Sequence, residues 1–274
     1  MCSKVMIDAE YFKDKKLIIY GTGYVTHMFL KALRINGLKD NVRCCVITHV
    51  SKNAGTFEGI PVYGVYDINI DLDAIVCIAV HESIKNEIEN IVKKVTNRYI
   101  WIYPYIYKLL LGNPLKKNIM IGVEEVLDCY EDDLRLAVRL AAIEYHDGKN
   151  DYGMRYYIKA LLINCEKETA YKRLKQFMEL VEKWQQFGYN KQFPITVNSS
   201  YEVIDGDHRV SMAVYTGQKS ICSNIYSSKL SIQEIHEDQA MMTEKILMQN
   251  GFTQKDMEIL EDIQWRYINV YQER

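Results

Sequence analysis

The sequence predicts an α/β protein with two domains: a parallel-sheet domain over residues 1–115, then an α+β domain with added helices over residues 116–274. Three observations predict this organisation. The chain has 274 residues, a length that favours two ordinary domains. Its first hundred residues alternate short apolar runs with helical patterns, as βα units do. Amphipathic helices then surround a compact strand–turn–strand segment.

Composition and charge limit the classes of function. Hydrophobic residues make up 48% of the chain and charged residues 26%, so the chain can bury sizeable cores and is not disordered. Lys and Arg number 34 against 36 Asp and Glu, a balance that argues against a dedicated nucleic-acid binder. The seven cysteines are odd in number and lack CxxC spacing, as expected of reduced thiols in a cytoplasmic protein.

The N-terminal elements follow one another in βα order. A helical pattern follows the first apolar run, and its residues Val25, Phe29 and Leu33 share one face. A second helical pattern covers residues 82–95. The apolar runs predict strands that are buried on both faces of a parallel sheet, and they span residues 15–20, 42–47, 74–80 and 99–103. These residues predict a small Rossmann-like sheet. The longest apolar stretch, 99–112, is too short and too interrupted to span a membrane.

A glycine turn follows the first predicted strand. In "IYGTGYVT", Gly21 is expected to make the turn, and Gly23 would let the backbone approach a phosphate at the start of the helix. Thr26 replaces the usual third small residue, and no acidic residue ends the second strand to hold a ribose. The region 15–105 resembles the Rossmann-like N-terminal domains of bacterial surface-polysaccharide and sugar-modification proteins. Two interpretations of this region are kept: Gly21, Gly23 and His81 form a second ligand site, or the glycine turn is purely structural.

The C-terminal half is predicted to combine helices with a hairpin. Residues 110–118 are expected to be a linker between the domains. Two short strands joined by "NSS" indicate a hairpin, and a further strand follows. The hairpin and the later strand span 193–204 and 220–226, and the expected helices are 131–146, 153–163, 168–188, 231–252 and 253–270.

The pentad "DGDHR" lies between the second hairpin strand and a helix. Gly206 suits a close backbone approach, and a helix that begins near Asp207 would direct free amides at an anion. His208 and Arg209 could add donors to phosphate oxygens, and Asp205 could hold a divalent cation or accept a substrate proton. The alternative is structural, with Asp205 as a helix cap and Arg209 in an ion pair.

With its flanks, the pentad resembles the core of the ParB/sulfiredoxin superfamily over residues 165–226. Sulfiredoxins have a reactive cysteine where this chain has Asp207, and ParB proteins use an arginine-rich turn with a following helix-turn-helix domain. The D-G-H-H-R-type turn of ATP-dependent free-serine kinases is more similar. That resemblance implies ATP and Mg²⁺ as cofactors, with Asp205, His208 and Arg209 at the phosphates and the metal. It also implies an upstream glutamate as base; Glu168 is the candidate taken here, although no motif decides between it and Glu166.

The leading hypothesis is therefore an ATP/Mg-dependent kinase for the hydroxyl of a small molecule: a sugar, polyol or amino acid in surface-glycan precursor synthesis. A non-catalytic nucleotide-binding switch is the first alternative. A sugar-nucleotide or NAD-dependent enzyme that uses the glycine turn is the second. The expected partners are a nucleotide and a small hydroxylated substrate, with no nucleic acid and no membrane span; a homo-oligomer stays open.

Overall fold

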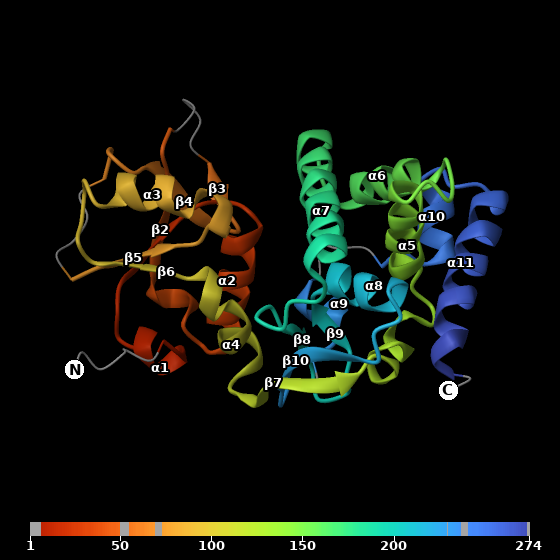
Figure 1. The fold of residues 1–274 in the computed structure, drawn as a ribbon. Coiled ribbons are helices and arrows are strands. Elements are labelled where there is room, and N and C mark those ends of the chain that lie inside the picture. The colour runs from red at the N-terminus through yellow and green to blue at the C-terminus, as the bar shows by residue number, and fades with distance from the viewer. Residues whose placement is uncertain (1–6, 50–54, 69–72, 229, 237–240, 273–274) are drawn as a thin grey trace. The chain divides into compact units, whose positions relative to one another are not determined.

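The computed structural model describes residues 7–49, 55–68, 73–228, 230–236 and 241–272. The chain divides into two compact units, Met1–Gly112 and Asn113–Arg274, here called unit 1 and unit 2 (Figure 1). The sequence analysis placed this boundary after residue 115. The protein is a mixed α/β protein with parallel strands, and each unit has its own sheet.

Unit 1 is built on one mostly parallel sheet with the strand order β3-β4-β2-β1-β5-β6. The apolar runs form its centre: every residue of β1 and β5 is buried. Only the short β3 runs antiparallel, and it pairs with β4. The strands are β1 (Leu17–Tyr20), β2 (Val42–Ile47), β3 (Thr56–Phe57), β4 (Ile60–Gly64), β5 (Ile75–Ile78) and β6 (Tyr99–Trp101).

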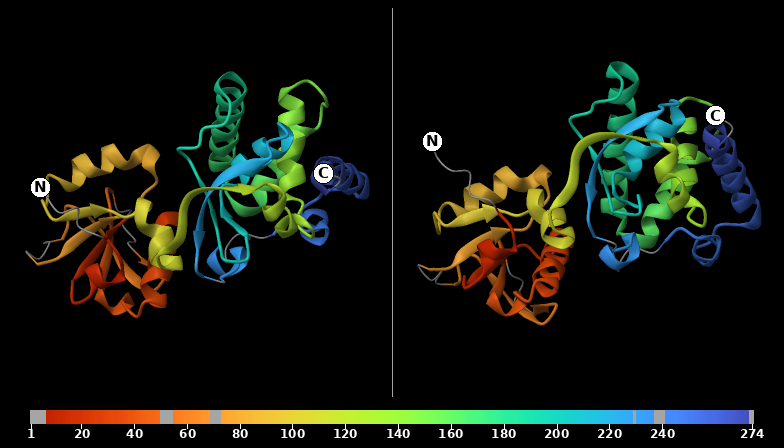
Figure 2. Two further views of the ribbon diagram at one scale, coloured as in Figure 1. Left: turned by 60° about the horizontal axis from the view of Figure 1, so that its bottom comes forward. Right: turned by 90° about the horizontal axis from the view of Figure 1, so that it is seen from below.

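Helices cover both faces of this sheet. Ile88 and Val92 of α3 pack with Ile18 and Val76 of the sheet, and Figure 2 shows α2 on the opposite face. This arrangement explains why the central strands are apolar throughout. The helices of unit 1 are α1 (Ala9–Phe12), α2 (Tyr24–Ile35), α3 (Lys85–Val92) and α4 (Ile106–Leu111).

Unit 2 contains a four-stranded sheet with the order β7-β10-β8-β9. Strand β10 runs antiparallel to β7 and parallel to β8, and β8 pairs antiparallel with β9. The pairing of β8 with β9 confirms the hairpin. The strands are β7 (Pro114–Gly122), β8 (Ile195–Val197), β9 (Val203–Asp205) and β10 (Ser220–Tyr226).

Two sequence predictions for unit 2 were wrong. The expected linker enters β7 at Pro114, because its backbone pairs with β10 about a hundred residues later in the chain. The helix expected over 231–252 is not continuous either: α9 ends before His236, and Thr243 caps a separate helix, α10. The helices are α5 (Arg135–His146), α6 (Gly153–Asn164), α7 (Lys167–Phe187), α8 (Asp207–Tyr215), α9 (Ile232–Ile235), α10 (Glu244–Gln249) and α11 (Gln254–Gln272).

Helix α5 forms the centre of unit 2. It is buried almost all round, although Tyr145 near its C-terminal end is 39% exposed. Helix α6 approaches it so closely that a Cβ on Gly153 would lie 1.8 Å from the carbonyl oxygen of Ala141. Asn150 bridges the two helices by donating to Ala141 and accepting from the amide of Gly153. This packing fixes the helix that supplies the arginines of the site.

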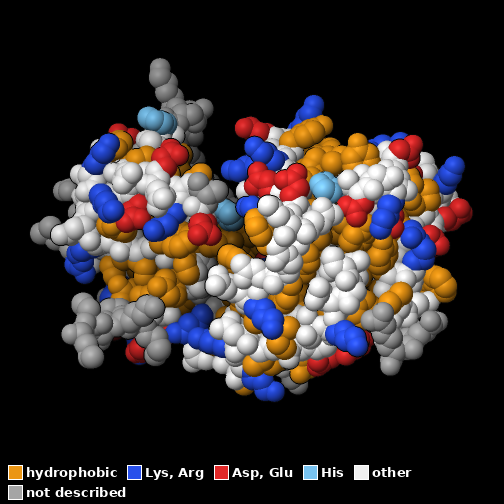
Figure 3. Space-filling model, in the orientation of Figure 1, with side chains coloured by type: hydrophobic (Ala, Val, Ile, Leu, Met, Phe, Trp, Pro, Cys, Tyr) orange, Lys and Arg blue, Asp and Glu red, His pale blue; other side chains and the backbone are white. Residues whose placement is uncertain are grey.

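The surface shows no large region of one charge on the face seen in Figure 3, where basic and acidic side chains are interspersed on each unit. This distribution agrees with the nearly balanced charge of the chain. Among the described residues, no helix is both long enough and apolar enough to cross a bilayer.

Candidate functional site

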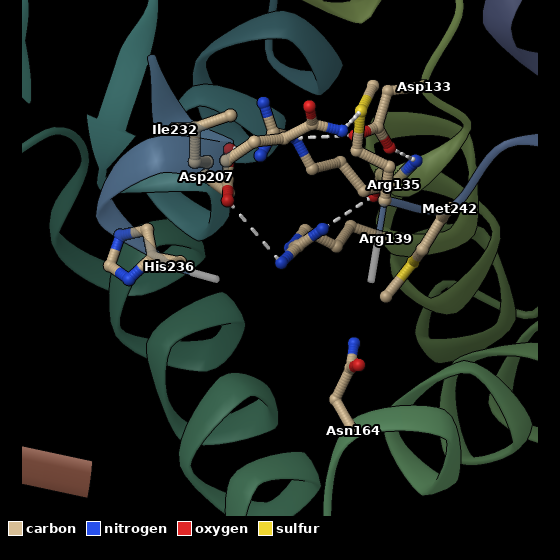
Figure 4. A pocket seen from close by; sticks show the side chains of 10 residues that line it. Asp133, Arg135, Arg139, Asn164, Asp207, Ile232, His236 and Met242 are labelled. Atoms are coloured by element: carbon tan, nitrogen blue, oxygen red, sulfur yellow. Dashed lines mark hydrogen bonds and ion pairs between the residues drawn. The ribbon is translucent and has the colours of Figure 1, made fainter. Parts of the chain in front are cut away.

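Unit 2 contains a small polar pocket among α5, α8, the C-terminal end of α6 and the segment around α9 (Figure 4). Its volume is about 50 Å³. Because a water-sized occupant needs about 10–15 Å³ on this measure, the pocket has room for roughly three to five heavy atoms. Its lining residues are Asp133, Arg135, Arg139, Asn164, Asp207, Ile232, Gln233, His236, Met241 and Met242.

Two arginines from α5 dominate the pocket. Arg135 and Arg139 are separated by one helical turn, so they lie on the same face of α5. The side chain of Arg135 is 9% exposed and that of Arg139 is 12% exposed. Figure 4 shows the Arg139 guanidinium facing Asp207, with the Asn164 amide pointing toward it.

Both guanidinium groups have N–H donors that lack an acceptor among the described residues. The buried Nε atoms of Arg135 and Arg139 have no hydrogen-bond partner within the described part of the chain. Arg139 donates through Nη1 to the carbonyl oxygen of Arg135 at 2.7 Å. A buried donor without a partner costs about 1–3 kcal/mol, and more when it is charged. Unused donors of this kind suggest a site that an acceptor completes.

Asp207 is the counter-ion shared by the two arginines. Its carboxylate lies 3.6 Å from Arg135 Nε and 3.6 Å from Arg139 Nη2, distances of ion pairs and not of hydrogen bonds. The Tyr130 hydroxyl donates to Asp207 Oδ1 at 2.6 Å. Burial by itself raises the pKa of Asp207, but Arg135 and Arg139 outweigh it and lower the pKa to about 2. Asp207 is therefore ionised at neutral pH.

Asp133 supplies a second carboxylate behind the arginines. It is 1% exposed and accepts the backbone N–H of Arg135 at 2.9 Å. Its Oδ2 lies 3.5 Å from Arg135 Nε. Burial raises the pKa of Asp133 against the opposing charge of Arg135. The four charges of the pocket are thus held close together without close hydrogen bonds between the carboxylates and the guanidinium groups.

His208 lies directly after Asp207 but is turned into the helical core. Its Nε2 shares a 2.6 Å hydrogen bond with the Tyr157 hydroxyl, and its ring lies 4.4 Å from that of Phe177. Burial, and then the charge of Arg139, lower the pKa of His208 to about 3. His208 is therefore neutral at physiological pH, and its Nε2 is engaged by the Tyr157 hydroxyl, whereas the sequence predicted it as a donor to phosphate oxygens.

Arg209 and Asp205 pair with each other. Arg209 donates to the carbonyl oxygens of Phe193 at 2.9 Å and Pro194 at 2.6 Å, and to Asp205 Oδ2 at 3.1 Å. This is the ion pair of the structural alternative, although Gly206, and not Asp205, caps the helix. The structure therefore gives Arg209 a fixed role in holding the start of β8 against the pentad.

Gly206 is required by packing. Its φ is +114°, and a Cβ there would lie 2.6 Å from Ile195 Cγ2. The group that closely approaches Gly206 is thus the side chain of Ile195 in the neighbouring strand β8.

The remaining predicted residues lie elsewhere. Glu168 is exposed in the first turn of α7 and has no recorded contact with the other predicted residues in the described part of the chain. Gly21 and His81 lie just beyond the ends of the paired parallel strands β1 and β5, and Gly23 caps α2. A Cβ on Gly21 would press on the Ala79 carbonyl oxygen at 3.0 Å, so packing also requires this glycine. The described residues contain no group of three or more His, Cys, Asp or Glu placed to hold a metal ion.

Apart from Asp207, the residues that line the pocket were not predicted from the sequence. One signal was present: "RLAVR" places two arginines a single turn apart within a helix that is otherwise apolar. Tyr130, Asn164 and His236 gave no such signal, because tertiary packing alone brings them to Asp207 or to the pocket.

A scan of family models and searches of curated proteins and of solved structures found no match to this chain.

Proposed function

We propose that unit 2 binds a phosphoryl group in the pocket of Arg135 and Arg139, and that the protein is an ATP/Mg-dependent phosphotransferase acting on a hydroxyl of a small molecule. One observation supports this more than any other. Two buried guanidinium groups, whose Nε atoms have no hydrogen-bond partner among the described residues, line a pocket of about 50 Å³. Arginine matches phosphate oxygens well because its planar fork donates two parallel hydrogen bonds.

The electrostatic balance of the pocket is compatible with an anionic ligand. Asp207 neutralises the arginines from 3.6 Å and leaves their donors available to an oxygen that approaches within about 2.9 Å. Tyr130 holds the Asp207 carboxylate in place. A phosphoryl group would then replace weak ion pairs with charge-assisted hydrogen bonds.

The order of elements around the pocket supports the superfamily resemblance. Hairpin β8–β9 leads through Gly206 into α8, and β10 returns parallel to β8. On this proposal unit 2 has a ParB/sulfiredoxin-like core with α5, α6 and the C-terminal helices added. Unit 1 is a Rossmann-like domain of the kind found in surface-polysaccharide proteins, and the acceptor belongs to surface-glycan precursor synthesis.

The residues take different roles on this proposal. Arg135 and Arg139 bind the phosphoryl group, and Asp207 orients them. Asp205, whose side chain is 47% exposed, is the carboxylate available for Mg²⁺ or for the proton of the acceptor hydroxyl. Mg²⁺ is commonly held by one or two carboxylates together with substrate phosphates, so a single aspartate is compatible with it. When bound, ATP and Mg²⁺ would supply the transferable phosphoryl group and neutralise its charge.

Calorimetric titration with inorganic phosphate and with Mg-ATP at fixed ionic strength tests the binding step. Arg139→Ala should weaken both affinities by about 10- to 150-fold, the value of a charge-assisted hydrogen bond. Arg139→Lys should recover only part of the lost affinity, because lysine keeps the positive charge but lacks the two parallel donors of the guanidinium group. Arg155→Ala is the matched control, since Arg155 is exposed on α6. Equal losses in the Arg139→Ala and Arg155→Ala variants would refute the site.

A second candidate function is a nucleotide-binding switch without catalysis. The 3.1 Å ion pair between Arg209 and Asp205 favours it, because that pair competes with a catalytic use of the carboxylate. Release of ADP from Mg-ATP, measured with a panel of sugars, polyols and amino acids, separates the two. In a kinase, Asp205→Asn should lower turnover by about 10²–10⁴-fold and spare ATP binding. In a switch, no acceptor raises ADP release.

A further inference from the structure

Helix α7 places one more arginine on the face that packs against His208. Phe177 of α7 lies against His208, with ring centroids 4.4 Å apart, and also against Tyr157 at 5.1 Å. Arg173 is four residues earlier on the same helix, so it lies on the same face about 5–6 Å away at the Cβ atoms. Ala170, three residues before Arg173 and fully buried, places the same face toward the core.

The pocket wall lies close in sequence to the start of α7. Asn164, the last residue of α6, lines the pocket, and α7 begins three residues later at Lys167. Arg173 is half-buried, and within the described part of the chain it makes neither a hydrogen bond nor an ion pair. Its charge acts with burial, Arg139 and Arg209 in lowering the pKa of His208.

We infer that Arg173 binds a second phosphate at the rim of the pocket, so that the site prefers a ligand with two linked phosphates over a monophosphate. The inference rests on the proposed function and deepens it. The pocket has room for only one phosphoryl group, so the next phosphate of a chain must lie outside it. Among the described residues Arg173 has no ion-pair partner, and it lies on the helix face that borders His208, the residue after the counter-ion of the pocket. The ligand class is thereby a nucleoside diphosphate or triphosphate, or another pyrophosphate.

Titration of the full chain with inorganic phosphate and with pyrophosphate tests this inference. We expect Arg173→Ala to weaken pyrophosphate binding by about 10- to 100-fold and phosphate binding by less than about 3-fold. Lys172→Ala is the matched control, because Lys172 is the exposed neighbour on α7 and its loss changes the net charge equally. Arg173→Lys should keep part of the preference, and thermal melting verifies that each variant is folded.

The outcomes separate this inference from the proposed function. If the wild type binds neither probe, the phosphoryl site itself is wrong and this inference falls with it. If the wild type binds both and Arg173→Ala lowers the two affinities equally, or matches Lys172→Ala, only the role of Arg173 is refuted.

Discussion

Asp207 is the carboxylate that balances the charges of two buried arginines in unit 2. It faces the largely buried Arg135 and Arg139, and within the described residues the Tyr130 hydroxyl is the one side chain that gives it a short hydrogen bond. Burying three charges with imperfect hydrogen bonds is costly, and an apolar core of the same volume is often as stable or more so. Such an arrangement is expected where the charges serve binding, as perturbed groups at functional sites do.

The first prediction concerns removal of that counter-ion. Asp207→Asn keeps the shape of the side chain but leaves the buried Arg139 guanidinium without its counter-ion and Arg135 with Asp133 alone, so the free energy of unfolding should fall by about 3–5 kcal/mol. Added inorganic phosphate should restore more stability to the variant than to the wild type, because it replaces the missing negative charge. Urea unfolding with and without phosphate measures both effects.

The control for this substitution is Asp262→Asn, which breaks an exposed ion pair with Arg266. Exposed pairs contribute about 0–1 kcal/mol, so the control should change little. An Asp207→Asn loss no larger than that of Asp262→Asn would contradict the account of the pocket.

The second prediction is a pH dependence of stability from His208. Its pKa is about 3 in the folded chain and is ordinarily 6.5, so the unfolded chain binds a proton first as pH falls. The stability is therefore complete above pH 6.5 and decreases by about 1.4 kcal/mol per pH unit toward pH 3. Between pH 7.5 and 5 we expect a loss of about 2 kcal/mol, measured as the shift of the urea midpoint. His236, whose burial also lowers its pKa, adds to the same trend.

The contribution of His208 is isolated by His208→Gln, which can keep a hydrogen bond to Tyr157 and cannot titrate. This variant should flatten the profile between pH 6.5 and 5, whereas His146→Gln, at the C-terminal end of α5, should leave it steep. A profile in His208→Gln as steep as that of the wild type would show that other groups cause the loss.

The sequence located the site only in part. "DGDHR" was singled out because polar residues interrupt an apolar region, and the structure does begin α8 at Asp207 and line the pocket with that residue. The pentad alone does not show which of its five residues face the pocket. Arg209 has carbonyl acceptors at the start of β8, and His208 has Tyr157, and both partners are distant in sequence.

At the scale of elements, a glycine lies at each end of helix α8, and the physical reason for glycine differs between the two ends. Gly206 and Gly217 both have positive φ, +114° and +66°. A Cβ on Gly206 would lie 2.6 Å from Ile195 Cγ2, whereas one on Gly217 would meet nothing within 4 Å. The N-terminal end is thus packed against β8, and the C-terminal end faces open space.

The third prediction compares alanine at these two glycines. Gly217→Ala should cost about 1–2 kcal/mol of unfolding free energy, which is the strain of a positive φ in an L-residue. Gly206→Ala should cost a further 1–3 kcal/mol or so, because its methyl group overpacks against Ile195. Paired denaturant titrations measure the difference. Equal costs would mean that β8 moves away freely from the start of α8.

Elements with a strong local pattern were predictable, and elements that depend on distant pairing were not. The strands β1, β2 and β5 fall within the predicted segments, and both ends of the long helices α7 and α11 lie within about two residues of the predicted ones. Strand β7 was missed because its first half contains the polar segment Lys-Lys-Asn, which is typical of a linker, and because its backbone pairs with the distant β10. The break between α9 and α10 was missed because the pattern alone did not show that Thr243 caps a new helix.

At the scale of the whole molecule, the two units have separate cores. A core cluster of unit 1 joins residues between Ile18 and Val92, and that of unit 2 joins residues between Ile121 and Tyr271. Neither cluster includes a residue of the other unit. A unit with its own sheet and its own apolar core meets the usual physical conditions for folding alone.

The last prediction is that residues 113–274 form a folded unit that retains the phosphoryl site. Every lining residue of the pocket lies within this range, as do Tyr130, Tyr157 and Arg173. The fragment should therefore melt cooperatively and bind pyrophosphate within about twofold of the full chain, since no removed residue contributes a donor. Circular dichroism melting and calorimetric titration measure these two properties, with the Arg139→Ala fragment as the control for binding at the pocket. A fragment that melts cooperatively but has lost pyrophosphate affinity would show that unit 1 contributes to the site, and one without a cooperative transition would show that the two cores depend on each other.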